Sequence, residues 1–265
     1  MIKQKIKDGL KKYPKLYSSL SDLKCLLGRF IRMFVPYRLR NYCDRQGFCG
    51  DTFLKYLVFS LSKWFTVTSC VETGSFKGDT TLFLAKIFPD VFKYSIELNS
   101  EYYKESLWRV RNFKKSLIIK GSSPNGIKKL IEDSKLGNLP LFFLDAHWHT
   151  YWPLLDELKQ ISKLNKAIII IHDFQVDGRP EYGYDSYKFK NKNISNNFDF
   201  ISTFTLAEDC KFLLPKYKAE EVFPEDPKIL RGYIIIFQNF KKDDWSKIIG
   251  SKLVDSYYEY GELPR

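Results

Sequence analysis

The chain has 265 residues, of which 44% are hydrophobic and 17% aromatic, and its formal net charge is +12. This length predicts one large domain, or one domain with an attached arm, and this composition excludes an intrinsically disordered chain. The most apolar run, residues 26–35, contains a glycine and two arginines, so it is too short and too charged to span a bilayer.

The positive charge is concentrated in residues 1–49. This segment contains 12 basic and three acidic side chains, which is +9, whereas the rest of the chain is nearly balanced at +3. Between Pro14 and Pro36, leucines and phenylalanines recur at steps of three and four, which predicts an amphipathic helix. We therefore expect a basic helical N-terminal arm over residues 1–49. It could pack on the main domain or dock on an anionic membrane surface or another acidic partner, whereas nucleic acid is a weaker candidate.

The cysteines and the first residues of the chain indicate a compartment. The five cysteines are odd in number and form no Cys-x-x-Cys pair, which favours a reducing environment. The N-terminal residues contain no apolar segment followed by a small-residue cleavage site, so they do not resemble a signal peptide. We expect a cytoplasmic protein, with the basic arm as the part that would attach it to a membrane surface.

From residue 50 onward, short apolar runs alternate with helical patterns. Asp51 is predicted to cap a helix that ends near Phe65. The predicted strands are Ser69–Glu72, Lys93–Glu97, Leu117–Lys120, Leu141–Asp145 and Ala167–Asp173. Helices are predicted between them at about 78–88, 100–113, 124–135 and 152–164. This alternation predicts an α/β domain over residues 50–265, built on a doubly wound and mostly parallel sheet.

The alternation stops after Asp173. Residues of about 175–200 are polar and rich in Tyr, Asn and Gly, which predicts a long excursion that could act as a lid. Two further strands are predicted at Lys211–Tyr217 and Gly232–Gln238. Because the short gap between them lacks a helical pattern, we expect them to pair antiparallel. The complete prediction is a seven-stranded sheet that ends in an antiparallel C-terminal hairpin.

Small and polar residues follow the first three strands at their carboxyl ends, where open parallel sheets bind ligands. The first strand leads into residues 72–78, Glu-Thr-Gly-Ser-Phe-Lys-Gly, whose glycines permit a tight turn and the close approach of a ligand. Glu97 ends the second strand, where a carboxylate can accept hydrogen bonds from both hydroxyls of a ribose. Ser122 and Ser123 follow the third strand and suit the edge of an adenine.

The fourth and fifth strands are followed by acids and histidines. All three histidines of the chain, His147, His149 and His172, lie just after these strands, together with Asp145 and Asp173. The carboxyl ends of neighbouring parallel strands meet at one edge of the sheet, so we expect these side chains to gather there. Such a cluster of titratable residues favours a catalytic site over scattered structural residues.

The spacing of the glycines distinguishes between nucleotide ligands. Dinucleotide-binding folds carry Gly-x-Gly-x-x-Gly, whose second glycine lets the backbone approach the pyrophosphate. Here three residues separate Gly74 from Gly78, and the bulky Phe76 stands where the middle glycine would fall. A ligand with a ribose and an adenine but no phosphate, such as S-adenosyl-L-methionine, fits better. Two alternatives stay open: an NAD(P)-dependent Rossmann oxidoreductase, and a non-catalytic module docked to an anionic surface through residues 1–49.

These features, in this order, resemble the class I S-adenosylmethionine-dependent methyltransferases over about residues 50–240. The run from Glu72 to Gly78 resembles the motif that wraps the methionine portion, and Glu97 matches the acid that holds the ribose. The resemblance implies a Rossmann-like methyltransferase fold with S-adenosyl-L-methionine as cofactor. The cofactor-binding residues that it implies are Glu72, Gly74, Ser75, Gly78, Glu97, Ser122, Ser123 and Asp145.

A narrower resemblance is to the metal-dependent O-methyltransferases of the catechol, caffeoyl-CoA and macrolide-sugar types. Asp145, Tyr151 six residues later, and the pair His172-Asp173 resemble elements of that family. The resemblance implies a divalent metal held by Asp145, His172 and Asp173, which would lower the pKa of an acceptor hydroxyl. His172 replaces a carboxylate of the family, so Mn²⁺, Fe²⁺ or Zn²⁺ becomes as suitable as Mg²⁺. Trp148 stands where the family often has a lysine base.

Without that lysine, a histidine becomes the candidate for the base that removes the hydroxyl proton. Methyl transfer is an in-line displacement, so the enzyme mainly aligns the acceptor with the sulfonium. A neutral imidazole suits the proton transfer, and either His147 or His149 could provide it beside Asp145. The sequence thus predicts O-methylation of a small-molecule or glycan hydroxyl.

Overall fold

The structure is a computed structural model that describes residues 44–147, 151–189, 192–202, 209–222 and 230–263. The chain divides into two units, Met1–Arg45 and Gln46–Arg265. Most of the predicted arm, residues 1–49, lies outside the described residues, so the arm stays a prediction. Its last residues are described: Phe48 is buried and packs edge-on against Phe143, within the second unit.

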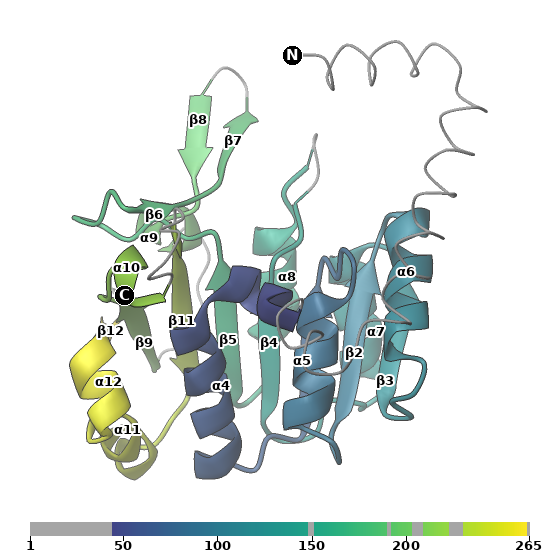
Figure 1. Ribbon diagram of the computed structural model, residues 1–265, viewed down its shortest axis with the longest axis horizontal. Helices are drawn as coiled ribbons and strands as arrows, with labels where there is room; N and C mark the ends of the chain where they lie inside the picture. The colour runs from purple at the N-terminus through teal and green to yellow at the C-terminus, as the bar shows by residue number, and fades with distance from the viewer. Residues whose placement is uncertain (1–43, 148–150, 190–191, 203–208, 223–229, 264–265) are drawn as a thin grey trace. The chain divides into compact units, whose positions relative to one another are not determined.

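The second unit is built on one eight-stranded sheet with the order β12-β9-β11-β5-β4-β1-β2-β3 (Figure 1). Its strands are β1 (Ser69–Thr73), β2 (Phe92–Glu97), β3 (Ser116–Lys120), β4 (Pro140–Leu144), β5 (Ala167–His172), β9 (Cys210–Pro215), β11 (Tyr233–Gln238) and β12 (Tyr258–Glu262). Strands β1 to β5 pair in parallel, and β11 is antiparallel to both β5 and β9. The mostly parallel sheet and the antiparallel C-terminal pair confirm the predicted fold class.

The sheet has one strand more than predicted. Strand β12 pairs antiparallel with β9 at the edge of the sheet. It follows the helices α11 (Lys242–Ile249) and α12 (Lys252–Tyr257). The sequence of this strand, Tyr-Glu-Tyr-Gly-Glu, lacks the apolar run of a central strand, because an edge strand buries only part of its surface.

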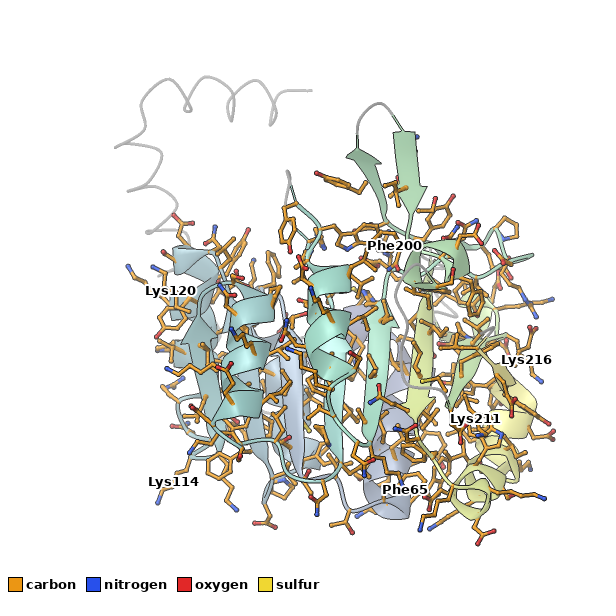
Figure 2. All side chains as sticks on the ribbon, turned by 180° about the vertical axis from the view of Figure 1, so that it is seen from behind. Phe65, Lys114, Lys120, Phe200, Lys211 and Lys216 are labelled. Carbon is orange, nitrogen blue, oxygen red and sulfur yellow. The ribbon has the colours of Figure 1, made fainter. Side chains whose placement is uncertain are left out.

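Helices cover both faces of the sheet. Helices α4 (Thr52–Trp64), α5 (Asp79–Ile87) and α6 (Ser100–Val110) lie over one face (Figure 1). Helices α7 (Ser123–Glu132) and α8 (Leu154–Ile161) lie over the opposite face, which is turned toward the viewer in Figure 2. Asp51 caps α4 as predicted, since its Oδ1 accepts the backbone N–H of Leu54 at 2.9 Å. Burial on both faces explains why β5 is a continuous run of isoleucines that are almost wholly inaccessible to solvent.

The strand order reverses between β1 and β4. The chain runs outward from β1 through β2 to β3, then returns to place β4 and β5 on the other side of β1. A crevice forms beyond the carboxyl ends of the strands at such a reversal, and it is the usual ligand site of an open α/β sheet. Gly74 after β1 and Asp145 after β4 therefore face the same crevice.

The predicted lid contains short strands in place of irregular loop. It holds β6 (Tyr182–Gly183), β7 (Ser186–Phe189) and β8 (Lys192–Ser195), followed by the short helix α9 (Phe198–Ser202). Strands β7 and β8 form a hairpin, and β6 pairs with β10 (Leu230–Arg231). A further short helix, α10, spans Ala219–Val222. None of the helices in the described ranges combines the length and the hydropathy that crossing a bilayer requires.

Candidate functional site

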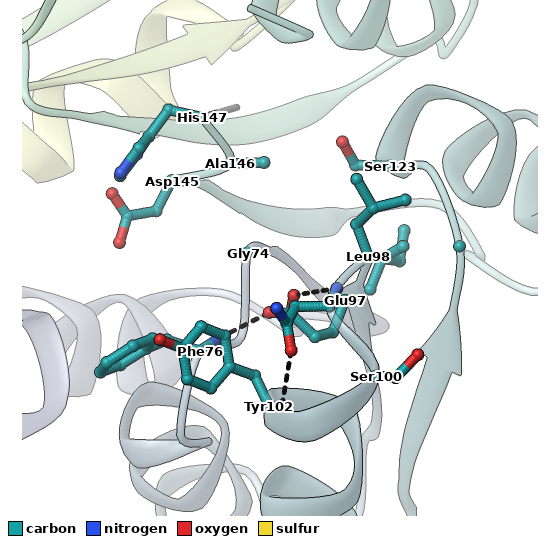
Figure 3. Close-up of a pocket in the computed structure, with 13 residues that line it drawn as sticks. Gly74, Phe76, Glu97, Leu98, Ser100, Tyr102, Ser123, Asp145, Ala146 and His147 are labelled. Carbon is teal, nitrogen blue, oxygen red and sulfur yellow. Dashed lines mark hydrogen bonds between the residues drawn. The ribbon is translucent and has the colours of Figure 1, made fainter. Parts of the chain in front are cut away.

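A cavity of about 560 Å³ opens at the carboxyl ends of the strands, beside the reversal of strand order (Figure 3). Five of the predicted site residues line it: Gly74, Glu97, Ser123, Asp145 and His147. The other described members of the predicted set lie around it and not on its wall. The structure thus brings together residues from the ends of β1, β2, β3 and β4, as the sequence predicted.

The turn after β1 contains three residues with left-handed backbone, Gly74, Phe76 and Gly78. Gly74 has φ +76°, and a Cβ at this position would lie 2.8 Å from the carbonyl oxygen of Asp145. The loops after β1 and β4 therefore approach each other so closely that a side chain at Gly74 would clash with the backbone of Asp145 and Ala146. Phe76 also has a positive φ, 47°, and its side chain is half exposed on the cavity wall.

Glu97 ends β2 with a carboxylate that two backbone amides hold in place. Its Oε2 accepts the N–H of Phe76 at 2.8 Å, and its Oε1 accepts the N–H of Asn99 at 2.7 Å (Figure 3). The residue is only 7% exposed, yet it lines the cavity. A carboxylate has about four acceptor sites, so two remain beside these amides, one of which the Ser75 hydroxyl contacts only at 3.5 Å. Pre-organised acceptors of this kind suit the vicinal hydroxyls of a ribose.

Glu72 lies beneath the turn and not in the main cavity. Its Oε2 accepts hydrogen bonds from the hydroxyls of Thr81 and, at 2.7 Å, Ser95. Burial raises the pKa of Glu72 to about 7, although these hydrogen bonds oppose the shift. Glu72 borders a smaller cavity of about 90 Å³, which shares Gly74, Phe76 and Asp145 with the main one. In the structure, Glu72 holds the base of the turn through its hydrogen bonds with Thr81 and Ser95.

Ser75 and Gly78 also shape the turn from outside the main cavity. The Ser75 hydroxyl lies 3.2 Å from that of Ser106 and 3.5 Å from Glu97 Oε2, so it supports the Glu97 carboxylate. Gly78 is the left-handed N-cap of α5, packed against Ser106. Ser75 and Gly78 therefore help to position neighbouring groups and do not themselves line the main cavity.

The two predicted serines have different positions. Ser122 is the N-cap of α7 and does not line the cavity, whereas Ser123 is buried and lines it. Two apolar residues that the sequence analysis did not assign to the site, Leu98 and Tyr102, line it too. The Tyr102 ring packs edge-on against Phe76 with centroids 4.4 Å apart. Leu98 follows Glu97 directly, so its place beside the cavity could have been inferred from the sequence.

His172 joins the two aspartates that follow β4 and β5. Its Nδ1 lies 2.9 Å from Asp145 Oδ1 and 3.1 Å from Asp173 Oδ1. Ionised carboxylates only accept hydrogen bonds, so the Nδ1–H of His172 is the donor to both. Burial of this ring would lower its pKa, but the charge and hydrogen bond of Asp145, with the hydrogen bond of Asp173, raise the pKa of His172 well above its usual range.

Arg231 is a site residue that the sequence analysis missed. Its Nε donates to Asp173 Oδ1, and its Nη2 donates to Asp185 of the lid. Burial alone would raise the pKa of Asp173, but His172 and Arg231 hold it well below its usual range. Arg231 lies in a two-residue strand, 58 residues after Asp173. No local pattern in the sequence connects these two residues.

His147 projects into solvent at the mouth of the cavity. Its side chain is 63% exposed, and its Nδ1 lies 3.7 Å from Asp185 Oδ2. Asp145 and His147 lie side by side in Figure 3, at one end of the cavity. His149 and Trp148 lie outside the described residues, so only His147 can be placed.

The predicted metal ligands are already engaged with other groups of the protein. Asp145, His172 and Asp173 do lie together, but the Nδ1 of His172 is within hydrogen-bond distance of both aspartates. Arg231 also donates to Asp173, so a metal would have to displace these contacts. A different set among the described residues, Asp145, His147 and Asp173, places one ligand atom each within 4.8 Å of the others. In this set the histidine that could serve as a ligand is His147 and not His172.

A further buried acid lies close to Asp145. Glu157 belongs to the first turn of α8, is almost wholly buried, and borders a very small cavity together with Asp145 and His172. Burial raises the pKa of Glu157 to about 7, although the nearby side chains of Ser123 and Thr73 oppose the shift. In the sequence it resembles an ordinary acid of a helix N-terminus, so its burial could not be predicted.

No protein-family model and no curated protein sequence matches the chain. Among solved structures, the O-methyltransferase TomG from Streptomyces achromogenes, in complex with SAM, is similar over 71% of this chain and 80% of its own, with 14% identity and a TM-score of 0.49. The O-methyltransferase from Bacillus cereus, in complex with SAH, is similar over 71% and 79%, with 15% identity and a TM-score of 0.47. Precorrin-6y C5,15-methyltransferase from Geobacter metallireducens is similar over 74% and 91%, with 11% identity and a TM-score of 0.44. Similarity at this level does not identify a reaction, which the residues of the site must decide.

Proposed function

We propose that the protein is an S-adenosylmethionine-dependent methyltransferase that acts on an oxygen of a small-molecule or glycan hydroxyl. The observation that carries the proposal is Glu97. It is a buried carboxylate held by two backbone amides, and it faces a cavity of about 560 Å³ beside the reversal of strand order. This arrangement suits a ligand with a free ribose diol.

The rest of the cavity supports the same ligand. The turn over Gly74 to Gly78 would enclose the methionine portion, and Ser123 and Leu98 border the space that an adenine would occupy. Phe76 fills the position where a dinucleotide-binding turn needs a glycine, and its ring lies on the cavity wall. A pyrophosphate would have to approach the backbone at that point. The proposal therefore favours S-adenosylmethionine over the alternative ligand, NAD(P).

S-adenosylmethionine supplies a methyl group on a cationic sulfur, which leaves as a neutral thioether when the acceptor oxygen attacks. The chain would align the two reactants and accept the hydroxyl proton. Asp145, at the end of β4, stands where a carboxylate would face that cation. His147 is the described candidate for the base, because its exposed imidazole lines the cavity mouth next to Asp145.

Calorimetric titration of the protein with S-adenosylmethionine tests the proposal, with NAD and NADP titrated in parallel. We expect one molecule of S-adenosylmethionine per chain and no heat from either dinucleotide. Binding of NAD(P) without binding of S-adenosylmethionine would replace the proposal with the oxidoreductase alternative. A folded protein that binds none of these ligands would favour the non-catalytic module.

A further inference from the structure

Two side chains already contact the carboxylates that a divalent metal would join. His172 donates its Nδ1–H to both Asp145 and Asp173, and its side chain is only 3% exposed. Arg231 donates its Nε–H to Asp173 and an Nη2–H to Asp185. His172 thus connects the two acids at the ends of β4 and β5, and Arg231 adds a second donor to Asp173.

We propose that His172 and Arg231 replace the divalent cation in this site, so that Asp145 and Asp173 are held by hydrogen bonds and by the guanidinium charge instead of a metal. The inference rests on the proposed function, since it concerns how the transfer site is organised. It reassigns His172 from a ligand to a positioning residue. It also adds Arg231, which the sequence resemblance did not include.

The atoms that a metal would need are already engaged. Nδ1 is the atom of His172 that faces both carboxylates, at 2.9 Å from Asp145 and 3.1 Å from Asp173, so a metal joining the two acids would have to displace this pair of contacts. Oδ1 of Asp173 receives both His172 and Arg231. A metal at this oxygen would have to displace charge-assisted hydrogen bonds, which are among the stronger interactions in a protein. The guanidinium, which is always charged, would also repel it.

The competing arrangement is a metal on Asp145, His147 and Asp173. These residues place ligand atoms within 4.8 Å of one another. In that arrangement, Asp173 would have to bind through the oxygen that His172 and Arg231 leave free. His147 is exposed, and its Nδ1 lies 3.7 Å from Asp185 Oδ2, so binding a metal would bring the ion close to this further acid. The two arrangements make opposite predictions about metal binding.

The test uses the full-length protein with Mn²⁺ or Mg²⁺ as the probe, and thermal unfolding and calorimetry as readouts. After treatment with EDTA, we expect no bound transition metal by elemental analysis. We also expect an unchanged unfolding temperature when either ion is added, with or without S-adenosylhomocysteine. Binding of S-adenosylmethionine should persist in EDTA with a Kd changed by less than about two-fold. Saturable binding of one Mn²⁺ per chain that His147→Ala abolishes would overturn the inference.

Variants at Arg231 give a second and independent readout. Arg231→Met leaves Asp173 short of one donor and one positive charge, so this variant should gain stabilisation by Mn²⁺ that the unaltered protein lacks. Arg231→Lys keeps the charge and should not gain it. Arg179→Met is the matched control, because Arg179 pairs with Glu259 and Glu181 away from the cavity. If Arg231→Met folds and shows no gain with Mn²⁺, the guanidinium does not replace a cation; if it does not fold, the metal titration of the unaltered protein decides.

Failure of this inference can be distinguished from failure of the proposed function. Absence of S-adenosylmethionine binding would refute the proposed function whatever the metals do. Binding of S-adenosylmethionine that requires Mn²⁺ would preserve the proposed function and refute the inference. An acceptor screen by formation of S-adenosylhomocysteine, run in EDTA and in Mn²⁺, adds a catalytic readout: any acceptor should be methylated at rates within about two-fold in the two conditions.

Discussion

Replacing Glu97 with glutamine removes one charge and keeps the size of the side chain. In the protein, each oxygen of the Glu97 carboxylate accepts one backbone N–H, from Phe76 at 2.8 Å and from Asn99 at 2.7 Å. Glutamine has only one acceptor oxygen, so its amide group must face one of these two N–H donors. A buried donor without an acceptor costs about 1–3 kcal/mol.

The effect on the ligand follows from the same geometry. The carboxylate is expected to accept both hydroxyls of a ribose, and a hydrogen bond to a charged group contributes about 1.5–3 kcal/mol. Glutamine could retain roughly one of the two. We therefore expect the affinity for S-adenosylmethionine to fall about 10- to 100-fold, which corresponds to about 1.4–2.8 kcal/mol. The unfolding temperature should fall by about 2–4 °C for each kcal/mol of lost stability.

Isothermal titration calorimetry measures the first effect and thermal unfolding measures the second. Glu101→Gln is the matched control, because Glu101 is an exposed acid in the first turn of α6. It should leave both quantities unchanged. If Glu97→Gln lowers the unfolding temperature but leaves the affinity within about two-fold of the original, Glu97 supports the turn and does not bind the ribose.

Three further predictions concern neighbouring residues. Gly74→Ala should lower both stability and ligand affinity, because its Cβ would lie 2.8 Å from the Asp145 carbonyl oxygen at φ +76°; unaltered unfolding in urea would contradict the close approach. Glu157 has a pKa of about 7 in the folded protein, above its unfolded value, so it contributes stability at low pH that is lost as the pH rises toward 8. The free energy of unfolding of Glu157→Gln, compared with that of the unaltered protein, should therefore be higher at pH 8 than at pH 5, as measured by urea unfolding at both pH values. An equal difference at the two pH values would show that the pKa of Glu157 is not raised. His147→Ala should keep the affinity for S-adenosylmethionine and slow methyl transfer to a hydroxyl acceptor about 10²- to 10⁴-fold, measured as formation of S-adenosylhomocysteine; an unchanged rate would exclude it as the base.

The sheet could be predicted because its strands are buried in a way that leaves a clear pattern. Residues 168–171 are four isoleucines in succession, and the structure places them in the middle of the sheet with exposures of 0–1%. Strand β12 could not be found in this manner, since an edge strand with tyrosines and glutamates has no continuous apolar run. The strands of the lid were missed for the same reason.

The site, too, could be predicted only in part. Residues at strand ends, such as Glu97 and Asp145, could be placed by position alone, because the carboxyl ends of parallel strands meet. The hydrogen-bond partners of the site residues could not be predicted in that way. The role of His172 as a donor to two aspartates depends on the distance between two loops, and the contact from Arg231 depends on a return of the chain after 58 residues. Such long-range pairings appear only when the tertiary structure is known.

A crystal structure of the protein with S-adenosylhomocysteine tests the central claim most directly. We expect the ligand to lie in the cavity beside Gly74, with both ribose hydroxyls within about 2.6–3.2 Å of the Glu97 carboxylate. We also expect the sulfur to lie on the side of Asp145 and His147. A ligand bound elsewhere, or a ribose held by other residues while Glu97 contacts only Phe76 and Asn99, would contradict this claim.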